Sequence, residues 1–109
     1  MYTENRGSHS QFLNIYCENC GSHLLLYQKD GPGPLKRLYL DRIVAPEELS
    51  NVQKLKEIPN LICQKCKRLI AITTIYKREN RRAYALLAYV VIKKRGKRIY
   101  PPEVRTMHA

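Results

Sequence analysis

The chain has 109 residues and a formal net charge of +11 at pH 7, from 20 Lys and Arg against 9 Asp and Glu. This length predicts a single domain, and the charge favours an anionic partner such as nucleic acid. The longest apolar run, Ala83–Ile92, is much shorter than the roughly 20 residues of a membrane-spanning helix, and no secretory signal is visible. We therefore expect a cytoplasmic protein, or a nuclear one if the host has a nucleus, whose cysteines stay reduced and available to a metal.

The first part of the chain is expected to form a flexible tail followed by three strands. Residues 1–11 are polar and aperiodic, which is typical of a tail. Strands are predicted for Phe12–Tyr16 and Leu24–Gln28, which are rich in apolar and aromatic residues. The glycines and prolines of Asp30–Pro34 predict a turn. The alternating residues of Leu35–Val44 then predict one continuous third strand.

A short surface helix is predicted in the middle of the chain, within Ala45–Pro59. Pro46 suits the start of a helix, the two glutamates after it complement the positive helix end, and Pro59 would end the helix. Three apolar residues would then share one side of it: Leu49, Val52 and Leu55.

The second half of the chain repeats the plan of the first. Leu61–Ile62 leads into the second cysteine pair, and the β-branched run Leu69–Tyr76 predicts a strand. Lys77–Asn80 predicts a turn, and Ala83–Lys94 predicts the returning strand of a hairpin. We therefore expect a mostly β domain at residues 12–96, made of two knuckle-plus-hairpin halves joined by a short helix. A basic, proline-containing tail would follow at residues 97–109.

The stretch 81–98 also fits a helix. Asn80 could cap it, Ala85–Ala88 contains good helix formers, and Gly96 could end it. The tyrosines and β-branched residues of this stretch, and its position after a strand, favour the strand. The sequence leaves both alternatives open.

All four cysteines lie in two Cys-x-x-Cys pairs, Cys17 with Cys20 and Cys63 with Cys66. Two turns that each offer two sulfurs can complete the tetrahedral shell of one zinc ion. Two disulfides are disfavoured without export, and a dithiol redox centre usually precedes a helix rather than a strand. Iron in a four-thiolate site stays chemically open. We therefore predict one metal ion, zinc, held by all four cysteines.

The two pairs and the strands around them resemble the zinc-ribbon superfamily, in which two Cys-x-x-Cys knuckles from two hairpins hold one zinc. The resemblance covers most of residues 15–94. Gly21 matches the small residue that commonly follows a knuckle, whereas Lys67 departs from that pattern after the second pair. The resemblance implies one structural Zn²⁺ per chain, because four thiolates leave no position for an activated water. Zinc ribbons occur in ribosomal proteins, transcription factors and polymerase subunits, so the fold alone does not define a function.

Little in the sequence is equipped for catalysis. His9 and His108 fall in the expected tails, and His23 could bind the metal only by displacing a cysteine. Gly31–Pro34 lacks backbone donors at its prolines, and no Lys-Ser/Thr pair follows it as in a phosphate-binding loop. We therefore expect neither an enzyme nor a small-molecule substrate.

Basic residues concentrate in the C-terminal third of the chain. The stretch 77–109 has ten basic and two acidic residues, which supplies +8 of the net charge of +11. Such clusters suit phosphates, and tyrosines between them can stack on bases or simply pack a core that has no Trp. We therefore predict binding to RNA, more than to DNA, or to a ribonucleoprotein. The predicted contacts are Lys77, Arg78, Arg81, Arg82, Lys93, Lys94, Arg95, Lys97 and Arg98. The candidate stacking residues are Tyr39, Tyr76, Tyr84, Tyr89 and Tyr100.

A protein-interaction subunit of a larger complex is the alternative function. The segment Lys97–Pro102 suits an extended stretch lying on a partner, and Ala83–Ile92 is very apolar for a small sheet. Attachment of the basic tail to anionic lipid is a third reading, but no amphipathic helix accompanies the tail.

Overall fold

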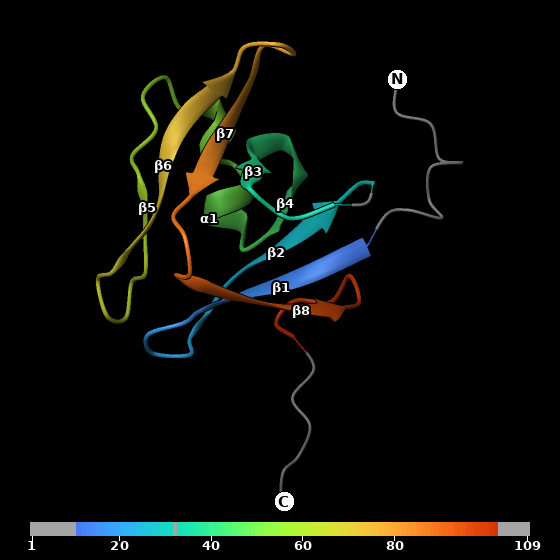
Figure 1. The fold of residues 1–109 in the computed structure, drawn as a ribbon, viewed down its shortest axis with the longest axis vertical. Helices are drawn as coiled ribbons and strands as arrows, with labels where there is room; N and C mark the ends of the chain where they lie inside the picture. Colours follow the sequence, from blue (N-terminus) through green and yellow to red (C-terminus); the bar gives the residue numbers. More distant parts are fainter. Residues whose placement is uncertain (1–10, 32, 103–109) are drawn as a thin grey trace, which may run out of the picture.

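The computed structural model describes residues 11–31 and 33–102, which form two four-stranded antiparallel sheets around a shared core (Figure 1). The predicted mostly β architecture with one short helix is confirmed. Most of the two predicted tails, including His9 and His108, lies outside the described residues. Within the described part of the chain, no helix is long and apolar enough to cross a membrane.

The first sheet has the strand order β4-β2-β1-β8. β1 (Gln11–Cys17) and β2 (His23–Lys29) form a hairpin whose connection carries the first cysteine pair. β4 (Ile43–Ala45) pairs with β2 at one edge, and β8 (Val91–Gly96) pairs with β1 at the other. The two strands predicted around the first cysteine pair are therefore confirmed.

The second sheet has the strand order β3-β7-β6-β5. β5 (Leu61–Ile62) and β6 (Leu69–Tyr76) form the hairpin around the second cysteine pair. After the predicted turn, β7 (Arg81–Leu86) returns beside β6, and β3 (Arg37–Tyr39) pairs with β7. Because β7 and β8 are both strands, the helical alternative for this stretch is wrong.

Each sheet takes three strands from one half of the chain and one from the other, so two predicted strands are wrong in length. The predicted strand at 35–44 breaks into β3, the 3-10 turn η2 (Leu40–Arg42) and β4. Its buried residues are Leu38, Leu40 and Ile43. A continuous strand turns Ile43 to the opposite face from the other two, because side chains alternate with a period of two. The break lets all three enter the core.

The predicted returning strand at 83–94 breaks for a related reason. Its first part is β7 in the second sheet, and its second part is β8 in the first sheet. Between them the chain crosses from one sheet to the other (Figure 1) and buries Val90 on the way. The pairing of β8 with β1 is a contact between the two ends of the domain, which local sequence patterns do not encode.

The connection between the halves contains less helix than predicted. α1 (Glu47–Ser50) starts where expected and one 3-10 turn, η3 (Val52–Lys54), follows it, but the helix ends well before Pro59. Of the three apolar residues expected on one side, Leu49 and Val52 pack against the core, whereas Leu55 is 49% exposed.

The core lies between the two sheets and receives side chains from both. Its largest fully buried members are Ile15, Leu25, Leu38, Ile70 and Tyr84. The Tyr84 hydroxyl donates a hydrogen bond of 3.3 Å to a backbone carbonyl, so its polar end is satisfied although burial raises its pKa. This shared core holds the two hairpins, and therefore the two cysteine pairs, at one relative position.

The segment after β8 lies back on the first sheet. The ring of Tyr100 is 5.5 Å from the ring of His23, whose Nε2–H donates to Asn14 Oδ1 at 2.7 Å. Burial lowers the pKa of His23 and so favours its neutral form. Asn14 is itself buried, and a Cβ at Gly96 would lie only 2.6 Å from its Nδ2. Glycine at this position therefore allows the close contact between β8 and Asn14.

We expect Gly96→Ala to lower the free energy of unfolding by about 1–3 kcal/mol, because the added methyl group overpacks a buried hydrogen-bonded side chain. Urea unfolding followed by circular dichroism measures the change. Lys94→Ala, at an exposed position of the same strand, is the control and should change the free energy by less than about 0.5 kcal/mol. Equal stability of Gly96→Ala and the control would contradict this packing.

Candidate metal centre

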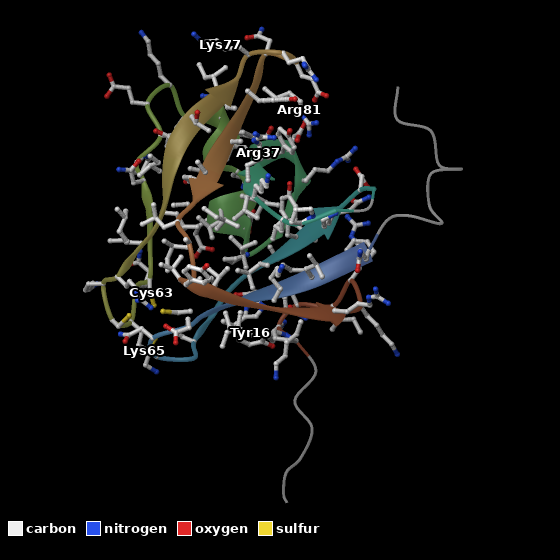
Figure 2. All side chains as sticks on the ribbon, in the orientation of Figure 1. Tyr16, Arg37, Cys63, Lys65, Lys77 and Arg81 are labelled. Atoms are coloured by element: carbon white, nitrogen blue, oxygen red, sulfur yellow. The ribbon has the colours of Figure 1, made fainter. Side chains whose placement is uncertain are left out.

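The four cysteines converge where the β1–β2 and β5–β6 hairpins meet (Figure 2), and their Sγ atoms all lie within 4.8 Å of one another. The Sγ atoms of Cys17 and Cys66 are 3.6 Å apart, and those of Cys20 and Cys63 are 3.5 Å apart. Four thiolates bound at about 2.3 Å in a tetrahedron would be separated by about 3.8 Å. The four side chains therefore fit one tetrahedral metal ion. Their separations are far longer than a disulfide bond of about 2.05 Å, and all four are free cysteines.

Both cysteine pairs adopt the same turn. In each, the N–H of the first cysteine donates to the carbonyl five residues later, at 2.9 Å in both turns. The N–H of the residue after the second cysteine donates back to the first cysteine's carbonyl, at 2.8 Å in both turns. That residue has positive φ, +79° at Gly21 and +68° at Lys67. The departure of Lys67 from the knuckle pattern therefore leaves the turn unchanged.

Hydrogen bonds outweigh the effect of burial at two of the thiols, Cys63 and Cys66. Burial raises the pKa of Cys17. Burial acts in the same direction on Cys63, but hydrogen bonds from the Ser22 hydroxyl and from backbone N–H groups of its own turn lower the pKa to about 6. The side chain of Asn19 and a backbone N–H lower the pKa of Cys66. The site thus favours thiolate, the form that binds a metal, at two of its four positions.

An ion pair joins the two knuckles at the surface. Arg68 Nη1, just after the second pair, lies 2.8 Å from Glu18 Oε1 in the first pair. Lys65 and Lys67 are exposed and, among the described residues, form no ion pair. Their positive charge lies close to the net negative charge that four thiolates and a divalent metal would carry.

The nine predicted nucleic-acid contacts fall into two separate groups. Four lie at the β6–β7 tip and the start of β7, and Figure 2 places Lys77 and Arg81 at the end of the molecule away from Cys63. The other five lie on or just after β8 in the first sheet. Because β7 and β8 belong to different sheets, the two groups do not lie on one hairpin.

Two residues of the tip group are engaged in internal contacts. Arg81 pairs with Asp41 at 2.7 Å and with Glu79 at 3.1 Å. Arg82 donates to two backbone carbonyls of the 53–55 segment. Arg81 thus joins the hairpin tip to η2, and Arg82 joins it to the connection between the halves, whereas the exposed Lys77 and Arg78 form no ion pair among the described residues.

The candidate stacking tyrosines also separate in the structure. Guanidinium groups lie 4.3 Å from the ring centre of Tyr76 and 3.8 Å from that of Tyr39, so both rings already make cation–π contacts. Tyr84 is buried in the core. Tyr100 is 47% exposed and contacts His23, whereas Tyr89 is 92% exposed.

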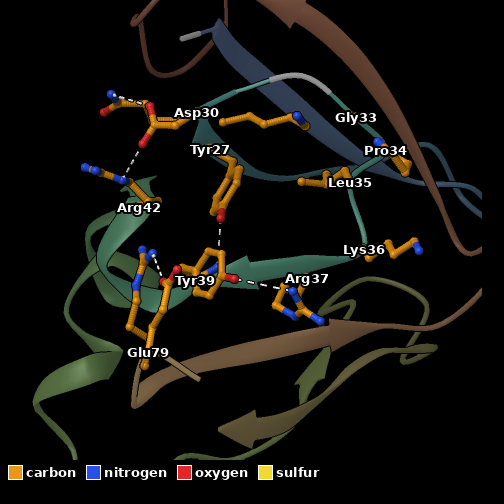
Figure 3. A pocket seen from close by; sticks show the side chains of 13 residues that line it. Tyr27, Asp30, Gly33, Pro34, Leu35, Lys36, Arg37, Tyr39, Arg42 and Glu79 are labelled. Atoms are coloured by element: carbon orange, nitrogen blue, oxygen red, sulfur yellow. Dashed lines mark hydrogen bonds and ion pairs between the residues drawn. The ribbon is translucent and has the colours of Figure 1, made fainter. Parts of the chain in front are cut away.

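A cleft of about 410 Å³ lies between β2, the segment that follows it, and β3 (Figure 3). Arg42 pairs with Asp30 across it at 2.8 Å. The Tyr27 hydroxyl accepts the N–H of Tyr39 at 2.8 Å, and burial raises its pKa to about 12. The guanidinium of Arg81 covers the Tyr39 ring. Most of its lining comes from the consecutive stretch 27–42, and Glu79 and Arg81 of the distant β6–β7 tip complete it, so the cleft depends on how these segments fold together and sequence reasoning did not find it.

The chain matches no protein-family model, no curated protein and no solved structure. Its likeness to zinc ribbons therefore rests on the four cysteines, the two matching turns and the two hairpins. This arrangement is compatible with a zinc-ribbon-like site that can hold one metal ion with four sulfur ligands.

We expect Lys67→Gly to raise the free energy of unfolding of the metal-loaded protein by about 0.5–1 kcal/mol, because glycine adopts positive φ without steric strain. Gly21→Ala at the matching position should lower it by about 1–2 kcal/mol. Urea unfolding of both variants measures the two changes. A loss of stability in Lys67→Gly would show that the lysine side chain, rather than the turn, is what the site requires there.

We expect the purified protein to carry one zinc per chain at pH 8 and to release it on acidification. Protons compete with the metal for the thiolates, and the lowered pKa values of Cys63 and Cys66 keep these two ligands in the thiolate form to lower pH than an ordinary thiol. Elemental analysis and a chromogenic zinc chelator measure content and release. Cys63→Ser, which leaves three sulfur ligands, should release zinc at a higher pH. Iron in place of zinc, or no metal at pH 8, would contradict the zinc assignment.

Proposed function

We propose that this protein is a non-catalytic zinc protein that binds RNA, alone or within a ribonucleoprotein. The four cysteines support a structural zinc, because a closed shell of thiolates leaves no position for a reactive water. The metal then holds the two hairpins together, and the surface of the folded domain does the binding.

The observation that carries the proposal is the basic edge of the first sheet. We call this surface the β8 edge; its cations are Lys93, Lys94, Arg95, Lys97 and Arg98. All five are exposed. Within the described residues no acidic side chain pairs with any of them, and β8 has no strand on its outer side. Arg95 donates a hydrogen bond to Gln11 Oε1 at 3.0 Å and Arg98 lies 6.0 Å from the Phe12 ring centre, but neither partner carries a charge. Successive strand residues point to opposite faces, so the five cations flank the edge strand on both faces. Their unneutralised charge favours a polyanion, because each cation can displace a counterion from a phosphate.

The tip of the β6–β7 hairpin contributes less to this proposal. Of its four basic residues, Arg81 and Arg82 are held by carboxylates and backbone carbonyls of the chain itself. Lys77 and Arg78 are free to contact phosphates, but they lie on the other sheet. We therefore assign the main contact to the β8 edge and a secondary one to these two residues.

A protein-interaction subunit is the second candidate, and one observation favours it. Ile99 and Tyr100, just after the β8 edge, are 45% and 47% exposed. Adjacent exposed apolar side chains suit a protein partner. Co-purification of a defined protein that persists after nuclease treatment would favour this function over RNA binding.

Neutralising the β8 edge should abolish most RNA binding. The variant replaces its five cations by glutamine, and its affinity for a labelled RNA is measured by fluorescence anisotropy. For the wild type, the logarithm of the affinity should fall with the logarithm of salt at a slope of about −3 to −4, from five phosphate contacts on a single strand. The variant should lose most of this slope.

A matched pair of smaller variants tests for a general effect of charge: one replaces Lys93, Lys94 and Arg95 of the β8 edge by glutamine, and the control replaces the exposed Lys36, Lys54 and Lys56 elsewhere. The two have the same net charge, so a general effect of charge would weaken both equally. Retention of affinity by the control alone would locate the contact on the β8 edge. Wild-type binding that does not respond to salt, or no binding at all, would contradict the proposed function.

A further inference from the structure

Tyr89 is the most exposed of the large hydrophobic residues in the described chain, with 92% of its surface accessible. It lies in the two-residue turn Ala88–Tyr89, where the chain crosses from β7 to β8. None of the described aromatic, cation–π or hydrogen-bond contacts involves its ring or hydroxyl. A tyrosine in this position therefore adds nothing to the core.

The backbone of Tyr89 is also unfavourable for a tyrosine. Its φ of +62° lies in the left-handed region, which large side chains rarely adopt. Two other residues with side chains share this feature: Asn80, a residue type that tolerates it in turns, and Lys67, which the knuckle turn requires. Glycine or asparagine would suit the turn at 88–89 better. Neither core packing nor the geometry of the turn therefore explains why a tyrosine occurs at position 89.

The residues on both sides hold the turn in place. The N–H of Leu87 donates to Ile70 O at 3.0 Å, and Val90 O accepts the N–H of Glu18 at 2.9 Å. Val90 is buried and Leu87 packs against the core. The turn is therefore anchored on each side, beside the first knuckle, and presents the ring to solvent from a fixed position.

The β8 edge begins directly after this turn. Lys93 is four positions after Tyr89, a distance of roughly 13 Å in an extended chain. An RNA strand lying along β8 could therefore place phosphates on the β8 edge and one base at Tyr89. A flat, exposed ring beside a row of cations is the combination that single-stranded nucleic acid requires, because unpaired bases stack on aromatic rings while cations bind the backbone.

From this geometry we infer that Tyr89 is a stacking platform for an unpaired base, so that the partner is single-stranded RNA rather than a duplex. The inference rests on the proposed function, because the β8 edge supplies the contacts to phosphate. A base within a duplex is already stacked on both faces and offers no free face to the ring.

The test uses Tyr89→Asn and Tyr89→Phe in the full chain with zinc bound. The probes are a labelled uridine oligomer of about 12 nucleotides and a blunt RNA duplex of the same length. Tyr89→Asn should weaken binding of the single strand about tenfold or more and change duplex binding less than about twofold. Tyr89→Phe, which keeps the ring, should bind like the wild type. The melting temperature of Tyr89→Asn should equal or exceed that of the wild type, because asparagine relieves the turn.

The outcomes separate this inference from the proposed function. Undiminished binding of the single strand by Tyr89→Asn, while the β8-edge variant fails to bind, would overturn the stacking role and leave RNA binding standing. Equal losses for both probes with a lower melting temperature would overturn it too, since Tyr89 would then be structural. A wild type that binds neither probe would overturn the proposed function itself.

Discussion

The convergence of four sulfurs within 4.8 Å ties together two hairpins that are separated in the chain by the 43-residue interval from Cys20 to Cys63. Closing such a long loop has an entropic cost, which a tetrathiolate metal centre is able to offset. Metal binding at such sites supplies on the order of 10–16 kcal/mol, comparable to the roughly 5–15 kcal/mol of net stability of a small domain. The relative position of the two sheets, and everything built on their surfaces, depends on this centre and on the core beside it.

The exchange of strands between the halves reinforces the same junction. β3 leaves the first half to pair with β7, and β8 leaves the second half to pair with β1. Each half therefore completes the other's sheet, and neither can bury its apolar residues alone. A metal ion bound by the four cysteines would hold the hairpins at their knuckle ends, while the exchanged strands extend the contact between the halves along both sheets. The breaks that permit the exchange also create the turn at residues 88–89, so the position of Tyr89 follows from the way the halves interlock.

The strong positive charge of the chain is divided between two uses. At the β6–β7 tip, Arg81 bridges Asp41 and Glu79 and covers Tyr39, so its charge stabilises the fold. Along β8, exposed cations follow one another without acidic partners among the described residues. Cations on an edge strand also discourage edge-to-edge aggregation. Any charged residue would discourage aggregation in this way. The exposed ring of Tyr89, just before the same edge, is a separate feature that suits stacking on a base.

The sequence by itself determined the four cysteines that converge on a possible metal site, the mostly β class, the two hairpins around the cysteine pairs and the start of the short helix. These features depend on local chemistry: two sulfurs in one turn, β-branched runs, and a proline followed by glutamates. Only the tertiary structure decided that two predicted strands break, that β8 joins β1, and which arginines and tyrosines are already engaged. Those outcomes depend on contacts between distant segments: β3 pairs with β7, and β8 pairs with β1. Basic and aromatic residues therefore form internal ion pairs and cation–π contacts near the β6–β7 tip, whereas along β8 they form an exposed surface.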